Sequence, residues 1–164
     1  MSSYVCYFDG ACKGNPGIGS YGFCIFRNKH LITEQGGFVG RKVTSNIAEY
    51  IAFIELLRYL NNTVLNDDEA IKRITILGDS ILVVNQIVKP KIKSKVLKRY
   101  HIQARREFKH LQKQLPCTKI AVRWISRKQN RRADKIAKTY RIHFEHVLCK
   151  DQNFRNVRML CLTY

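Results

Sequence analysis

Acidic residues are scarce in this sequence, which has 12 Asp and Glu against 30 Lys and Arg in 164 residues. It also lacks a long uninterrupted apolar run, so we expect no membrane-spanning segment. No basic stretch near Met1 leads into an apolar one, so we expect no secretory signal. A cytoplasmic location follows as the expectation, with a nuclear or viral location as the alternatives.

The six cysteines lack the spacing of a redox or metal motif, because none lies in a Cys-x-x-Cys pair. We therefore expect free thiols rather than a disulfide framework. The sequence also lacks internal repeats and low-complexity linkers. With 45% hydrophobic residues, a chain of this length can form one domain around a single core.

The net charge of +18 is unevenly distributed. Residues 1–88 contain eight basic and eight acidic residues, whereas residues 89–164 contain twenty-two basic and four acidic residues. Such asymmetry favours a polyanionic partner, namely DNA or RNA. The alternative is a basic face that is merely solvated.

The first third of the chain predicts an antiparallel meander. Strands are expected over Ser3–Asp9, Tyr21–Arg27 and His30–Val39. The composition of Gly10–Gly17 indicates a turn, and Asn28-Lys29 a tight connection.

The remainder alternates helices with strands. Apolar spacing predicts a helix from Ile47 to about Asn61, with Asn46 as its N-cap. The later expected elements are a buried strand over Ile71–Leu77, a short helix from Ser80 to Val88, a helix over Leu97–Gln114, a strand over Lys119–Ile125 and a helix from Asn130. This order predicts an α/β domain with a mixed sheet flanked by helices.

Four of the few carboxylates lie where chemistry is expected. Asp9 and Asp79 end strands, while Glu49 and Asp134 lie in the first turns of helices. If they converge, their repulsion calls for a hard divalent cation such as Mg²⁺. Singly, each has a plainer explanation: Glu49 in a capping box, Asp134 favouring a helix dipole, and Asp9 and Asp79 in turns.

The segments around these carboxylates resemble those of type 1 ribonuclease H. They are Asp9–Gly17 with Gly19–Gly22, Thr44–Tyr50, Gly78–Ser80 and Asn130–Asp134. The resemblance covers about residues 4–140. It implies a ribonuclease H-like fold, with a five-stranded mixed sheet of three antiparallel strands plus parallel strands. We expect residues 1–140 to form this domain and residues 141–164 to be a C-terminal extension packed on it.

The resemblance implies an endonuclease that hydrolyses the RNA strand of RNA/DNA hybrids and leaves a 5′-phosphate and a 3′-hydroxyl. Asp9, Glu49, Asp79 and Asp134 would be the catalytic residues and would hold two Mg²⁺ ions, with Mn²⁺ as a substitute. We expect a monomer whose partner is the hybrid.

Two groups of residues are expected to contact the hybrid. The resemblance implies contacts by Cys12, Lys13, Gly14, Asn15, Thr44, Ser45 and Asn46. Lys91, Lys93 and Lys95 would attract phosphates electrostatically in place of the basic protrusion that some members carry. The stretch Trp124–Asn130 departs from many relatives because it has no histidine, and Arg127 is the expected phosphate contact there.

Other functions remain open from the sequence. The chain could be a non-catalytic nucleic-acid-binding module of the same fold, a different nuclease acting on DNA, or the ribonuclease H domain of a reverse transcriptase polyprotein. Four retained carboxylates argue against a pure binder. His143, His146 and Cys149 could suggest zinc, but their helical spacing favours an amphipathic helix.

Overall fold

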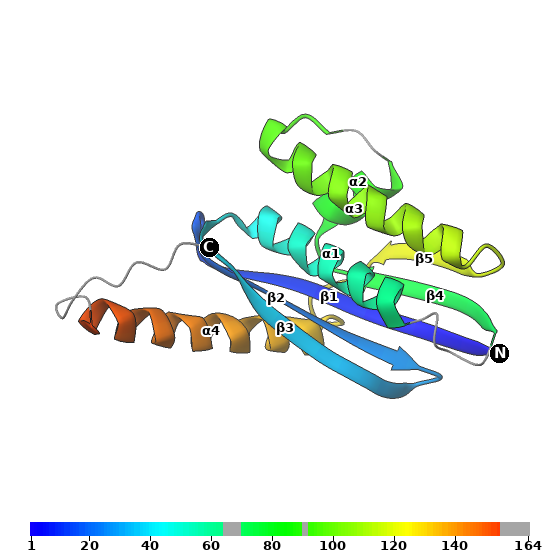
Figure 1. The fold of residues 1–164 in the computed structure, drawn as a ribbon, viewed down its shortest axis with the longest axis horizontal. Coiled ribbons are helices and arrows are strands. Elements are labelled where there is room, and N and C mark those ends of the chain that lie inside the picture. Colours follow the sequence, from blue (N-terminus) through cyan, green and yellow to red (C-terminus); the bar gives the residue numbers. More distant parts are fainter. Residues whose placement is uncertain (64–69, 90–91, 155–164) are drawn as a thin grey trace.

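The computed structural model describes residues 1–63, 70–89 and 92–154, with side chains described as far as residue 150. The elements are β1 (Ser2–Gly14), β2 (Gly17–Arg27), β3 (His30–Val43), α1 (Ser45–Thr63), β4 (Ile71–Gly78), α2 (Ile81–Val88), α3 (Lys95–Gln114), β5 (Lys119–Trp124) and α4 (Arg131–Phe154). Their order confirms the predicted α/β arrangement (Figure 1). None of the helices in the described part of the chain is long and apolar enough to span a membrane.

The five strands form one mixed sheet in the order β3-β2-β1-β4-β5. β1, β2 and β3 pair antiparallel, while β4 runs parallel to β1 and β5 parallel to β4, which confirms the predicted fold class. Phe8 of β1 pairs with Gly78 of β4. Asp9 and Asp79 each follow that pair directly, so the register alone brings two carboxylates to neighbouring positions.

Helices cover both faces of the sheet. On one face, the rings of Phe8 in β1 and Phe53 in α1 lie 5.3 Å apart, and α3 packs on α1. On the other face, α4 packs against β1, β2 and β3, and Ser20 Oγ donates a 2.6 Å hydrogen bond to the carbonyl of Ala137. Figure 1 shows α4 along the strands, on the side away from α1 and α3. The sheet therefore lies between helices on its two faces.

Gly10 allows α1 to approach β1 very closely. A Cβ at this position would lie 2.3 Å from the backbone nitrogen of Glu49 and 2.4 Å from the carbonyl carbon of Ala48. Backbone atoms cannot retreat from such a contact without moving the helix. The missing side chain thus places the first turns of α1, and Glu49 with them, directly beside Asp9.

Several local predictions need correction. β1 continues past Asp9 to Gly14, and β2 begins at Gly17 rather than Tyr21, because the two strands pair up to the Gly14–Gly17 pair. The turn expected over Gly10–Gly17 is therefore confined to two residues. β3 extends beyond Val39 to Val43, since pairing with β2 continues to that residue. The first turn of α1 is capped by Thr44 rather than Asn46, because Thr44 Oγ1 accepts a 3.3 Å hydrogen bond from the backbone N–H of Ile47.

The Asn28-Lys29 connection is confirmed. Both residues have positive φ, 49° and 73°, as expected of a two-residue hairpin turn.

We expect Gly10→Ala to lower the free energy of unfolding by about 2–3 kcal/mol, because the added methyl group overlaps the backbone of α1. Urea denaturation measures the loss. Gly40→Ala is the matched control, since a Cβ there would meet only a methyl group of Val43, at 2.7 Å. Equal stability losses in the two variants would contradict the close approach at Gly10.

Candidate active site

Three carboxylates from separate parts of the chain meet where β4 ends beside β1. Within the described part of the chain, Asp9, Glu49 and Asp79 form a group in which one carboxylate oxygen from each residue lies within 4.8 Å of the others. Asp9 belongs to β1 and is 3% exposed, Asp79 follows β4, and Glu49 lies on the second turn of α1. The structure thereby brings together three of the four carboxylates singled out in the sequence.

A buried amide holds the end of β4 in place beside β1. Asn130 is fully buried, and its Nδ2 donates to Asp79 Oδ1 at 3.0 Å and to the backbone carbonyl of Phe8 at 2.8 Å. The Gly10 backbone N–H donates to the Glu49 carboxylate. The Asp79 and Glu49 carboxylates are therefore each held by a hydrogen bond from a neighbouring segment.

The electrostatics of this cluster oppose full ionisation. Burial, followed by the charges of Glu49 and Asp79, raises the pKa of Asp9 to about 9. Burial and the charge of Asp79 raise the pKa of Glu49 to about 8. Three ionised groups at this separation repel one another unless a cation lies between them.

The donor set fits a hard divalent cation. Glu49 Oε2 is buried and accepts no hydrogen bond. A buried carboxylate oxygen without a donor is costly, and a metal ion would satisfy it. All the available donors are carboxylate oxygens, which Mg²⁺ and Mn²⁺ prefer over softer ligands.

Asp134 is placed differently from the other three carboxylates. Its Oδ1 accepts a 2.8 Å hydrogen bond from Arg127 and its Oδ2 a 2.7 Å hydrogen bond from Lys138. Partial burial opposes ionisation, but these two cations hold the pKa of Asp134 below its ordinary range. Asp134 is thus an ionised group with two cationic partners, and its role as a metal ligand stays a prediction.

The three carboxylates lie in a cleft of about 550 Å³. Five residues predicted to contact nucleic acid line the same cleft, namely Cys12, Lys13, Gly14, Ser45 and Arg127. Lys138, Arg141 and Glu145 of α4 complete the wall. The cleft therefore combines an acidic floor with basic side chains at its edges.

The other predicted contact residues occupy varied positions. Asn15 Oδ1 accepts a hydrogen bond from the backbone N–H of Ser45 at 3.1 Å, so this side chain ties the β1–β2 turn to α1. Thr44 caps α1, and Asn46 is exposed on the first turn of that helix. Lys93 and Lys95 are exposed at the start of α3, whereas Lys91 lies outside the described residues.

Four residues of the site were not singled out as functional from the sequence. The sequence did contain an indication of a functional role for Asn130, because it lies in the fourth motif, four residues before Asp134. Lys138 had a weaker one, since it follows Asp134 by one helical turn. Arg141 and Glu145 had none, because they come from α4 where the resemblance ends. His143, His146 and Cys149 form no metal-binding group among the residues described.

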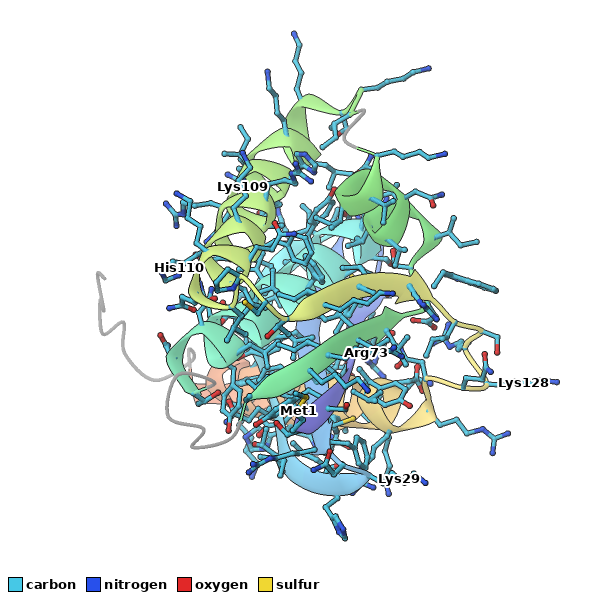
Figure 2. All side chains as sticks on the ribbon, turned by 90° about the vertical axis from the view of Figure 1, so that its right-hand side faces the viewer. Met1, Lys29, Arg73, Lys109, His110 and Lys128 are labelled. Carbon is cyan, nitrogen blue, oxygen red and sulfur yellow. The ribbon has the colours of Figure 1, made fainter. Side chains whose placement is uncertain are left out.

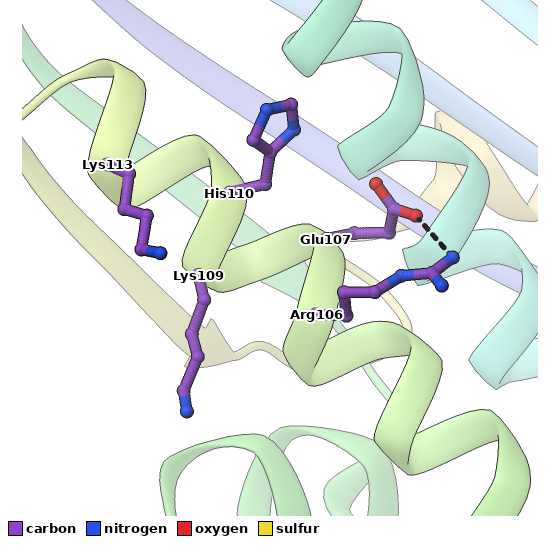
Figure 3. Close-up of a pocket in the computed structure, with 5 residues that line it drawn as sticks. All are labelled: Arg106, Glu107, Lys109, His110 and Lys113. Carbon is purple, nitrogen blue, oxygen red and sulfur yellow. Dashed lines mark hydrogen bonds and ion pairs between the residues drawn. The ribbon is translucent and has the colours of Figure 1, made fainter.

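A second hollow lies on α3 and has a different character. It is lined by Arg106, Glu107, Lys109, His110 and Lys113. Figure 3 shows Glu107 directed toward α1, where it accepts from Asn61 Nδ2 at 3.1 Å. The only carboxylate of this hollow is therefore engaged with a neighbouring helix, and the hollow does not offer the grouped oxygens of the first cleft.

Comparison with known proteins gives similarity at several levels. The family model described as RNase H matches residues 1–141. The ribonuclease H of Syntrophus aciditrophicus is 35% identical over 85 residues, which are 52% of this chain and 43% of that relative. The chain thus spans less than half the length of this curated relative.

Two solved structures have the same fold. The N-terminal RNase H domain of a Mycobacterium tuberculosis protein has a TM-score of 0.74 and 26% identity, covering 90% of this chain and 99% of that one. LC11-RNase H1 in complex with an RNA/DNA hybrid has a TM-score of 0.69 and 27% identity, covering 83% of this chain and 94% of that one.

The raised pKa values predict how metal-free stability depends on pH. Below about pH 4 the folded and unfolded chains both carry protonated Asp9, whereas above it only the folded protein keeps the proton. The contribution of Asp9 to the free energy of unfolding therefore falls as pH rises toward about 9. In EDTA, we expect the stability of Asp9→Asn relative to the wild-type protein to rise by at least about 2 kcal/mol between about pH 5 and about pH 8.

Urea denaturation of both proteins at the two pH values measures this difference. Glu34→Gln is the control, because this exposed carboxylate lies outside the cleft and its removal leaves the repulsion among Asp9, Glu49 and Asp79 in place. Mg²⁺ should then stabilise the wild-type protein more than Asp9→Asn. A pH-independent difference between Asp9→Asn and the wild-type protein would contradict the electrostatics described above.

Proposed function

This chain belongs to the ribonuclease H family, and we propose that it is an endonuclease that hydrolyses the RNA strand of RNA/DNA hybrids. The observation that carries the proposal is the Asp9–Glu49–Asp79 cluster beside the end of β4, inside a cleft with basic edges. The hybrid bound to the similar LC11-RNase H1 supports this choice of substrate. A pure binding module would gain nothing from an acidic floor facing phosphates.

Asp9, Glu49 and Asp79 would hold two divalent ions, Mg²⁺ or its substitute Mn²⁺, and Asp134 would join them by leaving Arg127 and Lys138. When bound, such ions would supply activation of the attacking water and neutralisation of charge on the leaving oxygen. The products would be a 5′-phosphate and a 3′-hydroxyl.

The chain's own residues would orient the hybrid against this cluster. Asn130 keeps the Asp79 carboxylate directed at the cleft through its 3.0 Å hydrogen bond. The β1–β2 turn and the start of α1, tied together by Asn15 and Ser45, form a polar edge that suits a minor groove lined with 2′-hydroxyls. Lys13 and Arg127 at the cleft would meet backbone phosphates.

The basic residues of the second half of the chain would provide the longer-range attraction. Figure 2 shows Lys109 and His110 on α3, and Lys128 in the loop between β5 and α4, on opposite sides of the view. Lys93 and Lys95 are exposed at the start of α3. Because positive charge is spread widely, binding should depend strongly on salt.

We expect Asp9→Asn, Glu49→Gln and Asp79→Asn each to reduce hybrid cleavage by about 10³-fold or more, because each removes part of the metal-binding cluster. Labelled hybrid, RNA duplex and DNA duplex are incubated with Mg²⁺, Mn²⁺ or EDTA. Only the hybrid should be cut, and only with metal. The matched control is Glu55→Gln, a carboxylate of α1 that pairs with Arg58 instead. Wild-type cleavage rates in all three variants would contradict the assignment of Asp9, Glu49 and Asp79 to the active site.

Replacing Lys93 and Lys95 with Ala should weaken hybrid binding and reduce the slope of log affinity against log salt by about one to two. The reason is that two fewer phosphates would be neutralised. Lys72→Ala with Lys119→Ala removes the same charge at the amino ends of β4 and β5, away from the cluster, and should leave the slope unchanged. An identical slope in both double variants would show that the α3 lysines form only a solvated face.

A further inference from the structure

One wall of the cleft contains a carboxylate held between two cations. Glu145 Oε2 lies 2.9 Å from Lys13 Nζ, and Glu145 Oε1 is hydrogen-bonded by Arg141. All three side chains line the cleft that contains Asp9, Glu49 and Asp79. This cluster is outside the metal-binding group, and Glu145 lies beyond residue 141, where the family match ends.

The cluster exists because α4 continues as a helix to Phe154. Arg141 and Glu145 are four residues apart, so they lie on the same helix face. Phe144 anchors this stretch to the sheet, since its ring centroid is 4.8 Å from that of Phe38 in β3. Glu145 is thereby held at the cleft rather than on a freely moving tail.

The Glu145 carboxylate is ionised at neutral pH. Burial opposes ionisation, but Lys13 and Arg141 hold the pKa of Glu145 below its ordinary range. The side chains of Glu145 and Arg141 are only 16% and 19% exposed, whereas Lys13 is 66% exposed. An anion therefore already lies against two cations beside the acidic cluster.

A phosphodiester matches this anion in chemistry. Like a carboxylate, it carries one negative charge on two free oxygens, and Arg pairs with both groups through two parallel hydrogen bonds. We propose that Lys13 and Arg141 form a binding site for a backbone phosphate of the hybrid, away from the scissile bond, and that Glu145 occupies this site in the free protein. The proposal rests on the proposed function, because it takes the hybrid as the ligand.

The exchange of one anion for the other is energetically easy. Lys13 is 66% exposed, and an ion pair whose cation lies in solvent contributes little to stability. A phosphate that displaces Glu145 finds the same two cations, and Glu145 gains water instead. Glu145 therefore acts as an internal competitor that weakens hybrid binding without blocking it.

The test compares two proteins for binding of the hybrid in Mg²⁺: the Asp79→Asn variant and the double variant Asp79→Asn with Glu145→Gln. Both carry Asp79→Asn so that the hybrid is not cut. We expect about fivefold tighter binding at low salt. The slope of log affinity against log salt should steepen by about 0.9, because the variant offers the hybrid one more uncompensated positive charge at the cleft. Adding Arg141→Gln to Glu145→Gln should reverse both effects.

Glu34→Gln is the matched control. It also removes one carboxylate paired with an arginine of α4, Arg132, but this pair lines a different hollow. Tighter binding of equal size in Glu34→Gln would assign the effect to net charge and overturn the proposal. Unchanged or weaker binding by Glu145→Gln would also overturn it. The Lys13, Arg141 and Glu145 contacts would then serve only to hold α4 against β1.

Failure of the proposed function gives a different result. If the protein without any substitution neither binds nor cuts a hybrid with Mg²⁺ or Mn²⁺, the proposed function fails. If it does both and Glu145→Gln binds no more tightly, the phosphate site alone is wrong.

Discussion

Mutual repulsion among Asp9, Glu49 and Asp79 is the constraint on which the rest of the site depends. Their oxygens lie within 4.8 Å of one another in a partly buried position, where the charged forms are most costly. The fold tolerates this arrangement because each residue is fixed by its backbone. Phe8 pairs with Gly78, and Gly10 leaves no space between β1 and α1. The cluster is therefore imposed by strand register and helix packing, against the preference of the carboxylates themselves.

Asn130, which directly precedes α4, helps to hold this cluster in place. Its amide donates to the carbonyl of Phe8 and to the carboxylate of Asp79, so one side chain directly before α4 links the end of β4 to β1. The same residue accepts the backbone N–H of Asp134 through its carbonyl at 3.1 Å. The position of the fourth carboxylate is thus coupled to that of the third through a single buried residue.

The sequence predicted the element order, the mixed sheet and the residues of the cluster, because apolar patterns and short motifs are local features. It failed where pairing across the sheet decides the outcome. Glycines in the first motif suggested a turn, yet pairing with β2 extends β1 to Gly14. Thr44 rather than Asn46 caps α1. The ion pair between Lys13 and Glu145 joins residues 132 positions apart, and nothing local predicts it.

At two places in the cleft, one carboxylate of the protein is paired with two cationic side chains. Asp134 is paired with Arg127 and Lys138, and Glu145 with Lys13 and Arg141, so two carboxylates of the protein partly neutralise four cations at the cleft. Acidic residues are scarce in this chain, which has a net charge of +18. Two of its few carboxylates nevertheless lie beside the cations that a polyanion would contact. Under the proposal above, a hybrid that binds at this cleft would exchange its phosphate for the Glu145 carboxylate, a residue outside the Asp9–Glu49–Asp79 cluster.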